Sequence, residues 1–358
     1  MAAERVMVGM SGGVDSSVCA ALLINMGYDV SGVTLRLYDG EHYNAGLTKT
    51  CCSLSDVEDA KAVCARLSVP HYVFNFKEAF QKEVIDRFVN EYICGGTPNP
   101  CIECNRHIKF DAMLKRAEIL GFDKIATGHY AVVKQDENGR FLLCRAADKS
   151  KDQTYVLYSM TQEQLSRTLF PLGSLTKSRV RGIAEENGFV NAKKPDSQDI
   201  CFVPDGDYAA FIERFTGEKS KPGSFVDGNG NIVGCHKGII RYTVGQRKGL
   251  GIALGKPVFV TEKNPLTNEV VLGDEEALFR KKVLVNNPNF IPFDTLKNEM
   301  RVTAKLRYRH TEQPAVIYPA ENGNVIIEFD KPQRAPSPGQ AAVFYDGDIV
   351  VGGGTIIN

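Results

Sequence analysis

A buried strand, a glycine-rich turn and a helix follow one another at the start of the chain, and this order constrains the fold most. Val6 to Met10 is a short apolar run typical of a buried strand. Ser11-Gly12-Gly13-Val14-Asp15-Ser16-Ser17 follows, and apolar residues at helical spacing then continue to Gly27, a typical C-terminal stop. Strand and helix signals alternate up to about residue 200. Such repetition predicts an α/β fold with a doubly wound parallel sheet, which binds ligands at the carboxyl ends of its strands.

The other elements of this region are predicted from the same patterns. Strands are expected at 28–38, 71–76 and 124–127, and helices at 80–92 and 108–120. Ser55 to Glu58 has the Ser-x-x-Glu form of a capping box, which predicts that a helix begins there and ends before Pro70.

The pattern changes near residue 205. Helical periods fade, and short β-rich runs stand between turns such as Pro222-Gly223 and Glu321-Asn322-Gly323. We therefore expect three domains: a nucleotide-binding catalytic domain at 1–203, a small β-rich central domain at 204–276, and a C-terminal β-barrel domain at 277–358.

Composition narrows the class of protein. Lys plus Arg number 43 and Asp plus Glu number 43, so any basic surface must be local. The chain lacks the ~18 consecutive apolar residues of a transmembrane helix, and its N-terminus does not resemble a secretory signal. We expect a cytoplasmic protein whose ten cysteines are reduced thiols. Cys19, Cys64 and Cys144 fall in apolar patterns and are expected in the core, whereas Cys51, Cys52 and Cys94 are left undecided.

The glycine-rich turn predicts a phosphate site. Backbone N–H groups in such a turn, together with a helix N-terminus, form a cradle for anions. The turn lacks the Gly-Lys-Ser/Thr of a Walker A loop and the Gly-x-Gly-x-x-Gly of dinucleotide sites. It resembles the pyrophosphate loop of the ATP pyrophosphatases, which cleave ATP between its α and β phosphates to activate a substrate. A plain strand-to-helix connection is the alternative.

Two thiols stand in polar, motif-like surroundings. Cys104 ends the proline-braced run Thr97-Pro98-Asn99-Pro100-Cys101-Ile102-Glu103-Cys104. Arg106, His107, Lys109 and a helix N-terminus are expected nearby, and all of them favour a thiolate nucleophile. Cys201 lies in Asp196-Ser197-Gln198-Asp199-Ile200-Cys201-Phe202, just before the composition changes.

Taken together, these motifs resemble those of the tRNA-specific 2-thiouridylases, and the resemblance covers essentially the whole chain. Beyond the three motifs above, it rests on Ala126-Thr127-Gly128-His129-Tyr130, Lys151-Asp152-Gln153 and Tyr242-Thr243-Val244-Gly245-Gln246-Arg247-Lys248-Gly249-Leu250-Gly251. It implies a pyrophosphate-loop fold similar to the adenine nucleotide α-hydrolases. It also implies ATP and Mg²⁺ as cofactors, with Asp15 as a candidate Mg²⁺ ligand.

The resemblance assigns roles to individual residues. Cys104 is expected to be the nucleophile and Cys201 the persulfide carrier, joined in a transient disulfide. The ATP site is expected to comprise Gly9, Met10, Ser11, Gly12, Gly13, Val14, Asp15, Ser16, Leu35 and Gly128. Asn99, Pro100 and Cys101 are expected to contact the target base. The residues expected to contact tRNA are His129, Lys151, Asp152, Gln153, Arg307, Tyr308 and Gln340.

The implied reaction is 2-thiolation of the wobble uridine of tRNA. Adenylation of the uracil C2 oxygen would make it a leaving group, and the Cys201 persulfide, or hydrosulfide released by Cys104, would supply sulfur. A cysteine desulfurase or a sulfur-relay protein is the expected donor. Cys101 is often Asp in the family, so either thiol of the Cys-x-x-Cys pair could bond Cys201, and three thiolates could instead hold an iron–sulfur cluster. The rival functions are an adenylating synthetase for a small molecule and a non-catalytic RNA-binding protein.

Two stretches are expected to meet the tRNA backbone. No acid occurs between Asp227 and Glu262, whereas Lys237, Arg241, Arg247, Lys248 and Lys256 do. Strand alternation from Arg301 to Arg309 would bury Val302, Ala304 and Leu306 and align cations along an edge, where they could contact phosphates. An ordinary solvated strand face is the alternative for this second stretch.

Overall fold

A computed structural model describes residues 3–38, 54–196 and 200–357. The chain divides into two compact units. Unit 1 comprises Met1–Ile85, Pro100–Gly206 and Asp348–Val350, and unit 2 comprises Asp86–Asn99, Asp207–Gly347 and Val351–Asn358. None of the helices in the described ranges is both long and apolar enough to cross a membrane.

Unit 1 is built on a parallel sheet. Within the described residues its strands follow the order β3 (His71–Asn75), β2 (Asp29–Arg36), β1 (Arg5–Gly9), β4 (Lys124–Ala126) and β7 (Thr168–Leu169). Neighbouring strands are parallel, which confirms the predicted doubly wound α/β fold.

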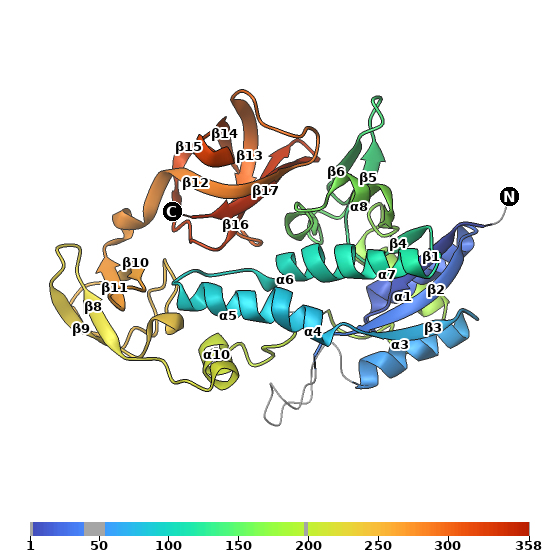
Figure 1. Cartoon of the computed structure of the whole chain (residues 1–358), viewed down its shortest axis with the longest axis horizontal. Helices are drawn as coiled ribbons and strands as arrows, with labels where there is room; N and C mark the ends of the chain where they lie inside the picture. Colours follow the sequence, from blue (N-terminus) through green and yellow to red (C-terminus); the bar gives the residue numbers. More distant parts are fainter. Residues whose placement is uncertain (1–2, 39–53, 197–199, 358) are drawn as a thin grey trace. The chain divides into compact units, whose positions relative to one another are not determined.

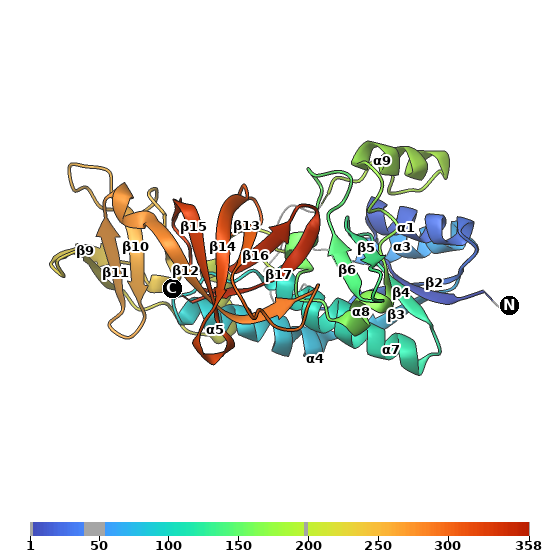
Figure 2. The same cartoon turned by 90° about the horizontal axis from the view of Figure 1, so that it is seen from above.

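Helices cover both faces of this sheet. The core of one face joins Val6 and Val8 of β1 to residues of three helices, which are α1 (Val14–Asn25), α3 (Leu54–Arg66) and α9 (Lys177–Glu186). Figure 2 shows α7 (Met113–Ile119) on the opposite side of the sheet from α1 and α9. Cys19, Cys64 and Cys144 are buried, as expected. Ser55 lies inside α3, so the structure does not support its predicted role as the residue that caps this helix.

The helix that carries Cys104 begins earlier than the apolar pattern predicts. It comprises α6 (Pro100–Glu103), a π-helical segment (Cys104–Ala112) and then α7. Pro100 stands at its first position, where a missing N–H costs no hydrogen bond. The earlier helical segments are α4 (Lys77–Phe80) and a π-helical turn (Gln81–Ile85). The rest of unit 1 includes a hairpin of β5 (Val132–Gln135) and β6 (Phe141–Cys144), and the short α8 (Gln162–Ser166).

Unit 2 contains a mixed sheet and a barrel (Figure 1). The mixed sheet has the order β10 (Phe259–Asn264), β11 (Glu269–Gly273), β8 (Gly223–Val226) and β9 (Ile232–His236). Beside it are α5 (Asp86–Ile93) and α10 (Tyr208–Thr216), joined through Phe88, whose ring centroid lies 6.2 Å from that of Phe211. Helical periods were expected to fade near residue 205, and α10, a nine-residue helix capped by Asp207, is an exception to that expectation.

The barrel closes because its first strand pairs with two others. Its strands are β12 (Phe279–Phe290), β13 (Met300–Lys305), β14 (Gln313–Pro319), β15 (Val325–Arg334), β16 (Ala341–Asp346) and β17 (Ile349–Ile356). Strand β12 pairs with both β15 and β17, which confirms the predicted C-terminal β-barrel.

The predicted row of cations differs from the observed one. Val302, Ala304 and Leu306 are buried as expected. However, β13 ends at Lys305 and lies between β14 and β16, so it is no edge, and Arg301 pairs with Asp330 at 2.7 Å. The alternation identified the buried face, but strand partners and ion pairs depend on residues distant in sequence.

Candidate active site

The glycine-rich turn of unit 1 is folded tightly against the start of α1. Gly12 has φ of +72°, a conformation that L side chains rarely adopt, and a Cβ there would lie 2.5 Å from the Asp56 carbonyl oxygen. The Ser16 hydroxyl donates to the Gly13 carbonyl at 3.0 Å. The turn therefore presents backbone N–H groups at a helix N-terminus, an arrangement that suits a phosphate.

Side chains that follow α9 hold this turn in place. Asn191 Nδ2 donates to the Gly12 carbonyl at 3.0 Å and to Ser17 Oγ at 2.9 Å. Lys194 Nζ donates to the same carbonyl at 3.2 Å and to Asp56 at 2.6 Å. Sequence reasoning missed both residues, because no local pattern marks a side chain whose partner is distant along the chain.

Three cations surround two carboxylates beside the turn. Lys177 Nζ lies 2.7 Å from Asp15 Oδ1 and 2.8 Å from Asp196 Oδ1, and the Lys177 side chain is 12% exposed. Asp196 also accepts from Lys151 at 2.9 Å and from Arg181 at 3.1 Å. Burial alone would raise the pKa of Asp196, but hydrogen bonds from the two lysines lower it to about 2. The cluster is suited to a highly charged anionic ligand.

The other predicted nucleotide residues lie at the same edge of the sheet. A Cβ on Gly128 would lie 2.7 Å from the Asp15 carbonyl carbon, so the loop that follows β4 meets the start of α1 at a glycine. Leu35 belongs to β2, two residues beyond Val33, which pairs with Gly9 at the end of β1. Asp15 accepts from Lys177 and from the Tyr130 hydroxyl, the latter at 2.9 Å. Its role as a Mg²⁺ ligand stays a prediction.

Cys104 lies in the second turn of its helix and is 9% exposed. The sequence predicts a helix N-terminus close to Cys104, but the helix begins four residues earlier, at Pro100. Arg106 and His107 lie 3.2 Å from opposite oxygens of Glu103, so this carboxylate partly neutralises the charge of Arg106. Cys104 instead begins a π-helical segment, a distortion frequent at functional sites. Cys101 is exposed.

Aromatic packing ties the segment of Cys201 to the helices of unit 1. The Tyr38 hydroxyl donates to the Cys201 carbonyl, and the Phe202 ring centroid lies 5.8 Å from that of Phe80. Phe80 belongs to α4, which contacts the π-helical segment that starts with Cys104. The pairing of the two thiols stays a prediction.

Parts of these motifs lie outside the described residues, namely Ser197-Gln198-Asp199 and the pair Cys51-Cys52. Among the residues that are described, no group of three or more His, Cys, Asp or Glu side chains could hold a metal ion. Three thiolates therefore do not converge in the described part of the chain.

Several residues of unit 1 that are expected to contact tRNA form hydrogen bonds with neighbouring groups of the same unit. His129 is 8% exposed, its Nδ1 lies 2.7 Å from Thr127 Oγ1, and burial keeps its pKa well below the usual range. The Asp152 carboxylate accepts from Thr154 Oγ1 at 2.6 Å. Gln153 Oε1 accepts from the Tyr130 N–H at 2.9 Å. Contact of these side chains with tRNA stays a prediction.

Two of the residues of unit 2 that are expected to contact tRNA also bond to backbone groups of their own unit. The Arg307 guanidinium donates to the Ala335 carbonyl, and Gln340 Nε2 donates to the Thr97 carbonyl at 2.6 Å. Tyr308 is 40% exposed.

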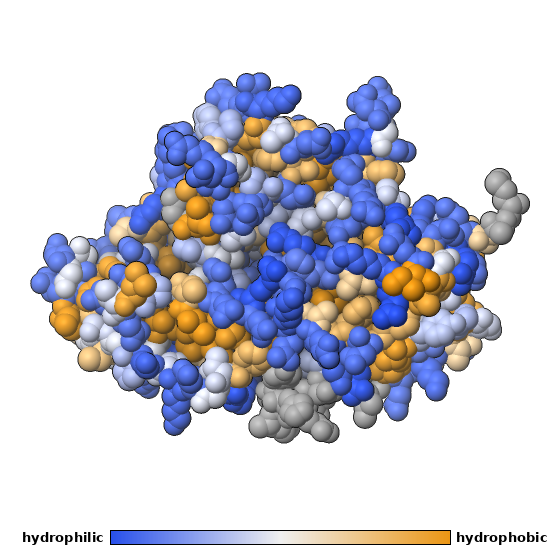
Figure 3. Space-filling view, viewed as in Figure 1, coloured by the Kyte–Doolittle hydropathy of each residue, from blue (hydrophilic) through white to orange (hydrophobic). Residues whose placement is uncertain are grey.

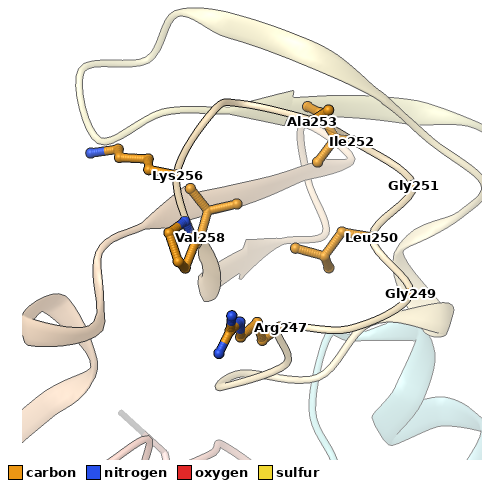
Figure 4. A pocket seen from close by; sticks show the side chains of 9 residues that line it. Arg247, Gly249, Leu250, Gly251, Ile252, Ala253, Lys256 and Val258 are labelled. Atoms are coloured by element: carbon orange, nitrogen blue, oxygen red, sulfur yellow. The ribbon is translucent and has the colours of Figure 1, made fainter.

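Unit 2 also contains a cavity of about 450 Å³ in a glycine-rich loop of its mixed-sheet region (Figure 4). It is lined by Arg247, Gly249, Leu250, Gly251, Ile252, Ala253, Lys256, Pro257 and Val258. None of the residues predicted for ATP or for the target base lines it.

Three family models together match most of the chain. Residues 4–205 match the family described as "tRNA methyl transferase HUP domain", residues 209–274 the "tRNA methyl transferase PRC-barrel domain" and residues 280–356 the "Aminomethyltransferase beta-barrel domain". A solved 4-thiouridine synthetase in complex with RNA and ATP is 19% identical, with a TM-score of 0.38 over 56% of this chain and 45% of that one.

Full-length relatives are far more similar. The tRNA-specific 2-thiouridylase MnmA of Acetivibrio thermocellus is 55% identical over 358 residues, covering 99% of this chain and all (100%) of that protein. The protein of the same name from Clostridioides difficile is 52% identical over 354 residues, covering 99% and 98%. With this identity along its full length, the chain belongs to the family of the tRNA-specific 2-thiouridylases MnmA.

Proposed function

We propose that this protein is an ATP-dependent tRNA sulfurtransferase that converts the wobble uridine of tRNA to 2-thiouridine. Membership of the 2-thiouridylase family supports the reaction class. The observation that carries the chemistry is the glycine-rich turn at the start of α1, with Lys177 bonded to its Asp15 and Lys151 and Arg181 bonded to Asp196.

The nucleotide half of the reaction uses this turn. Backbone N–H groups from Ser11 to Ser16 would hold the phosphates of ATP, and the three cations would stabilise the charge of departing pyrophosphate. Mg²⁺ bound with ATP would neutralise phosphate charge, and Asp15, the acidic residue of the turn, is its candidate ligand. The uracil C2 oxygen attacks the α-phosphate, and pyrophosphate leaves.

The sulfur half uses the two thiols. The terminal sulfur of a Cys201 persulfide attacks C2 and expels AMP, which leaves the uridine joined to Cys201 through a disulfide bond. The Cys104 thiolate then attacks the Cys201 sulfur and releases 2-thiouridine, and a Cys104–Cys201 disulfide remains. An external dithiol reduces that disulfide. The sulfur comes from a cysteine desulfurase or a relay protein, in the cytoplasm.

The experiment supplies tRNA, ATP and a persulfide donor, and then weighs the nucleosides of the digested RNA. We expect the mass gain of sulfur for oxygen on one uridine, and we expect Cys104→Ser and Cys201→Ser to abolish it. Cys235→Ser, which alters an exposed thiol of β9, is the matched control and should retain activity. Adenylation of a small molecule without RNA, unaffected by Cys201→Ser, would contradict the proposal.

A further inference from the structure

The segment that leads into the target-base residues is held by two side chains from much later in the chain. This segment runs from Gly95 to Asn99 in unit 2 and continues into Pro100 and Cys101. Its first residue, Gly95, has φ of +83°, so the backbone turns sharply after α5. A short run without regular structure keeps one conformation only if its backbone groups are bonded to fixed partners.

Two consecutive backbone carbonyls, those of Gly96 and Thr97, accept hydrogen bonds from side chains, and Lys263 of β10 is the donor to the first. Its Nζ donates to the Gly96 oxygen at 3.3 Å, and the Gly96 N–H donates to the Glu91 carbonyl at 2.8 Å. A Cβ at Gly96 would overlap the Glu91 carboxylate, so a larger residue there would displace that side chain. Burial lowers the pKa of Lys263 to about 8, and the charge of Glu91 opposes that shift, so the Lys263 ammonium group lies in partly desolvated surroundings.

The barrel region holds the second carbonyl. The Thr97 N–H donates to the Pro338 oxygen at 2.8 Å, and the Thr97 oxygen accepts from Gln340 Nε2 at 2.6 Å. Both backbone groups of Thr97 are thus bonded to one short stretch. That stretch is itself fixed to β17, because the Ile356 N–H donates to the Gln340 carbonyl at 2.8 Å.

A glycine permits this close approach. Gly339 has φ of +85°, and a Cβ there would lie 2.9 Å from the Thr97 nitrogen. The turn around Gly339 therefore fits directly against the segment, and a larger residue would separate the two.

We propose that Lys263 and Gln340 are positioning residues, which fix the backbone of Gly96 and Thr97 and thereby aim Asn99, Pro100 and Cys101 at the target uridine. The proposal rests on the proposed function for the identity of that substrate. Gln340 acts through Thr97, to whose carbonyl its amide donates. Preorganisation of this kind changes the rate at saturating substrate more than it changes substrate affinity.

The test combines two readouts on variants that keep side-chain length. Gln340→Met and Lys263→Met each remove a donor while retaining an unbranched side chain. Hydrogen exchange of the amides from Gly95 to Cys101 should accelerate in both variants. The single-turnover rate of thiolation at saturating tRNA and ATP should fall between about tenfold and a hundredfold, with the Kd for tRNA within about twofold of the wild type.

Two controls separate this effect from general loss of stability. Gln333→Met removes a similar bond inside the barrel, where Gln333 Nε2 donates to the Lys331 carbonyl at 2.7 Å, and it should leave both readouts unchanged. Lys263→Arg keeps a cationic donor and should recover most of the rate.

The readouts also distinguish failure of this inference from failure of the proposed function. Unchanged hydrogen exchange in both Met variants overturns the positioning role, whatever the activity. A higher Kd for tRNA with an unchanged saturated rate in Gln340→Met also overturns it and makes Gln340 a direct tRNA contact. If the wild type thiolates no tRNA, the proposed function fails, and accelerated exchange in the variants still supports the tethering of Gly96 and Thr97.

Discussion

Lys177 contacts the carboxylates of both Asp15 and Asp196, and these belong to the two motifs that sequence reasoning linked to ATP and to sulfur. A cation held between two carboxylates at the glycine-rich turn is already placed beside the predicted phosphate site. The carboxylates keep it there in the absence of nucleotide, and phosphate oxygens would compete for the same ammonium group.

We expect Lys177→Met to lower the rate of ATP-dependent thiolation by about a hundredfold, because it removes a charge that stabilises departing pyrophosphate. Rapid-quench assays at saturating tRNA measure this rate. Lys124→Met is the control, since Lys124 pairs with Glu4 at the surface of the same unit. An unchanged rate in Lys177→Met would show that the lysine is only structural.

The low pKa of Asp196 predicts that the stability of the folded protein depends on pH. Its pKa of about 2 lies below the ordinary value of 3.8, so the ionised carboxylate stabilises the folded state above pH 3.8, and this stabilisation is lost as the pH falls towards 2. Relative to Asp196→Asn, the wild type should therefore lose stability as the pH falls from about 4 to about 2. The loss should be about 1 kcal/mol or less, because the side chain is partly exposed and screened.

Urea unfolding followed by circular dichroism measures the difference between the two proteins. Asp346→Asn, at the exposed end of β16 in unit 2, is the control. If the free energies of unfolding of the wild type and Asp196→Asn differ by the same amount at every pH, the pKa of Asp196 is not lowered in the folded state.

At the scale of elements, the turn between β1 and α1 depends on its contact with α3. Gly12 and Gly27 both have positive φ, but only Gly12 would bring a Cβ against another element, the backbone of Asp56. Gly27 has nothing within 4 Å of such an atom. A substitution at Gly27 therefore tests backbone strain alone, whereas a substitution at Gly12 tests backbone strain together with a steric clash against α3.

We expect Gly27→Ala to destabilise the protein by about 1 kcal/mol, the cost of placing an L residue in the left-handed region. Gly12→Ala should cost at least about 1 kcal/mol more, because α3 must also move. It should weaken ATP binding as well, whereas Gly27→Ala should not. Urea unfolding and ATP titration give the two values. Equal losses of stability would mean that the contact with Asp56 is unimportant.

At the scale of the whole molecule, a chain with no net charge must bind tRNA through local cations. Many basic residues of unit 2 are neutralised by neighbours. Arg241 pairs with Glu213, Lys256 with Asp274, and Arg301 with Asp330. Arg247 and Lys248 are exposed, and neither contacts a carboxylate among the described residues. On the face shown in Figure 3, hydrophilic side chains are interspersed with hydrophobic patches over both units.

Replacing Arg247 and Lys248 with Gln should reduce the slope of log K against log salt for tRNA binding by about 1 to 1.5, since each phosphate contact contributes about 0.7. Binding isotherms at several salt concentrations measure the slope. Lys256→Gln should change it less, because Asp274 already neutralises that lysine. If the double variant retains the wild-type slope, the tRNA backbone does not meet this loop.

The sequence alone determined those features that depend on neighbours in the chain. Alternating strand and helix patterns predicted the parallel sheet, the spacing of Val302, Ala304 and Leu306 predicted a buried strand face, and Ser11 to Ser17 predicted a glycine-rich turn that leads into a helix. Each is a local property, since side-chain periodicity and backbone freedom are set within a few residues.

Only the tertiary structure decided which distant groups meet. It placed Lys177, Asn191 and Lys194 at the glycine-rich turn, paired Arg301 with Asp330, and turned Gln340 towards Thr97. Hydrogen bonds and ion pairs act over a few ångströms in space and are indifferent to separation along the chain, so no local pattern could specify them.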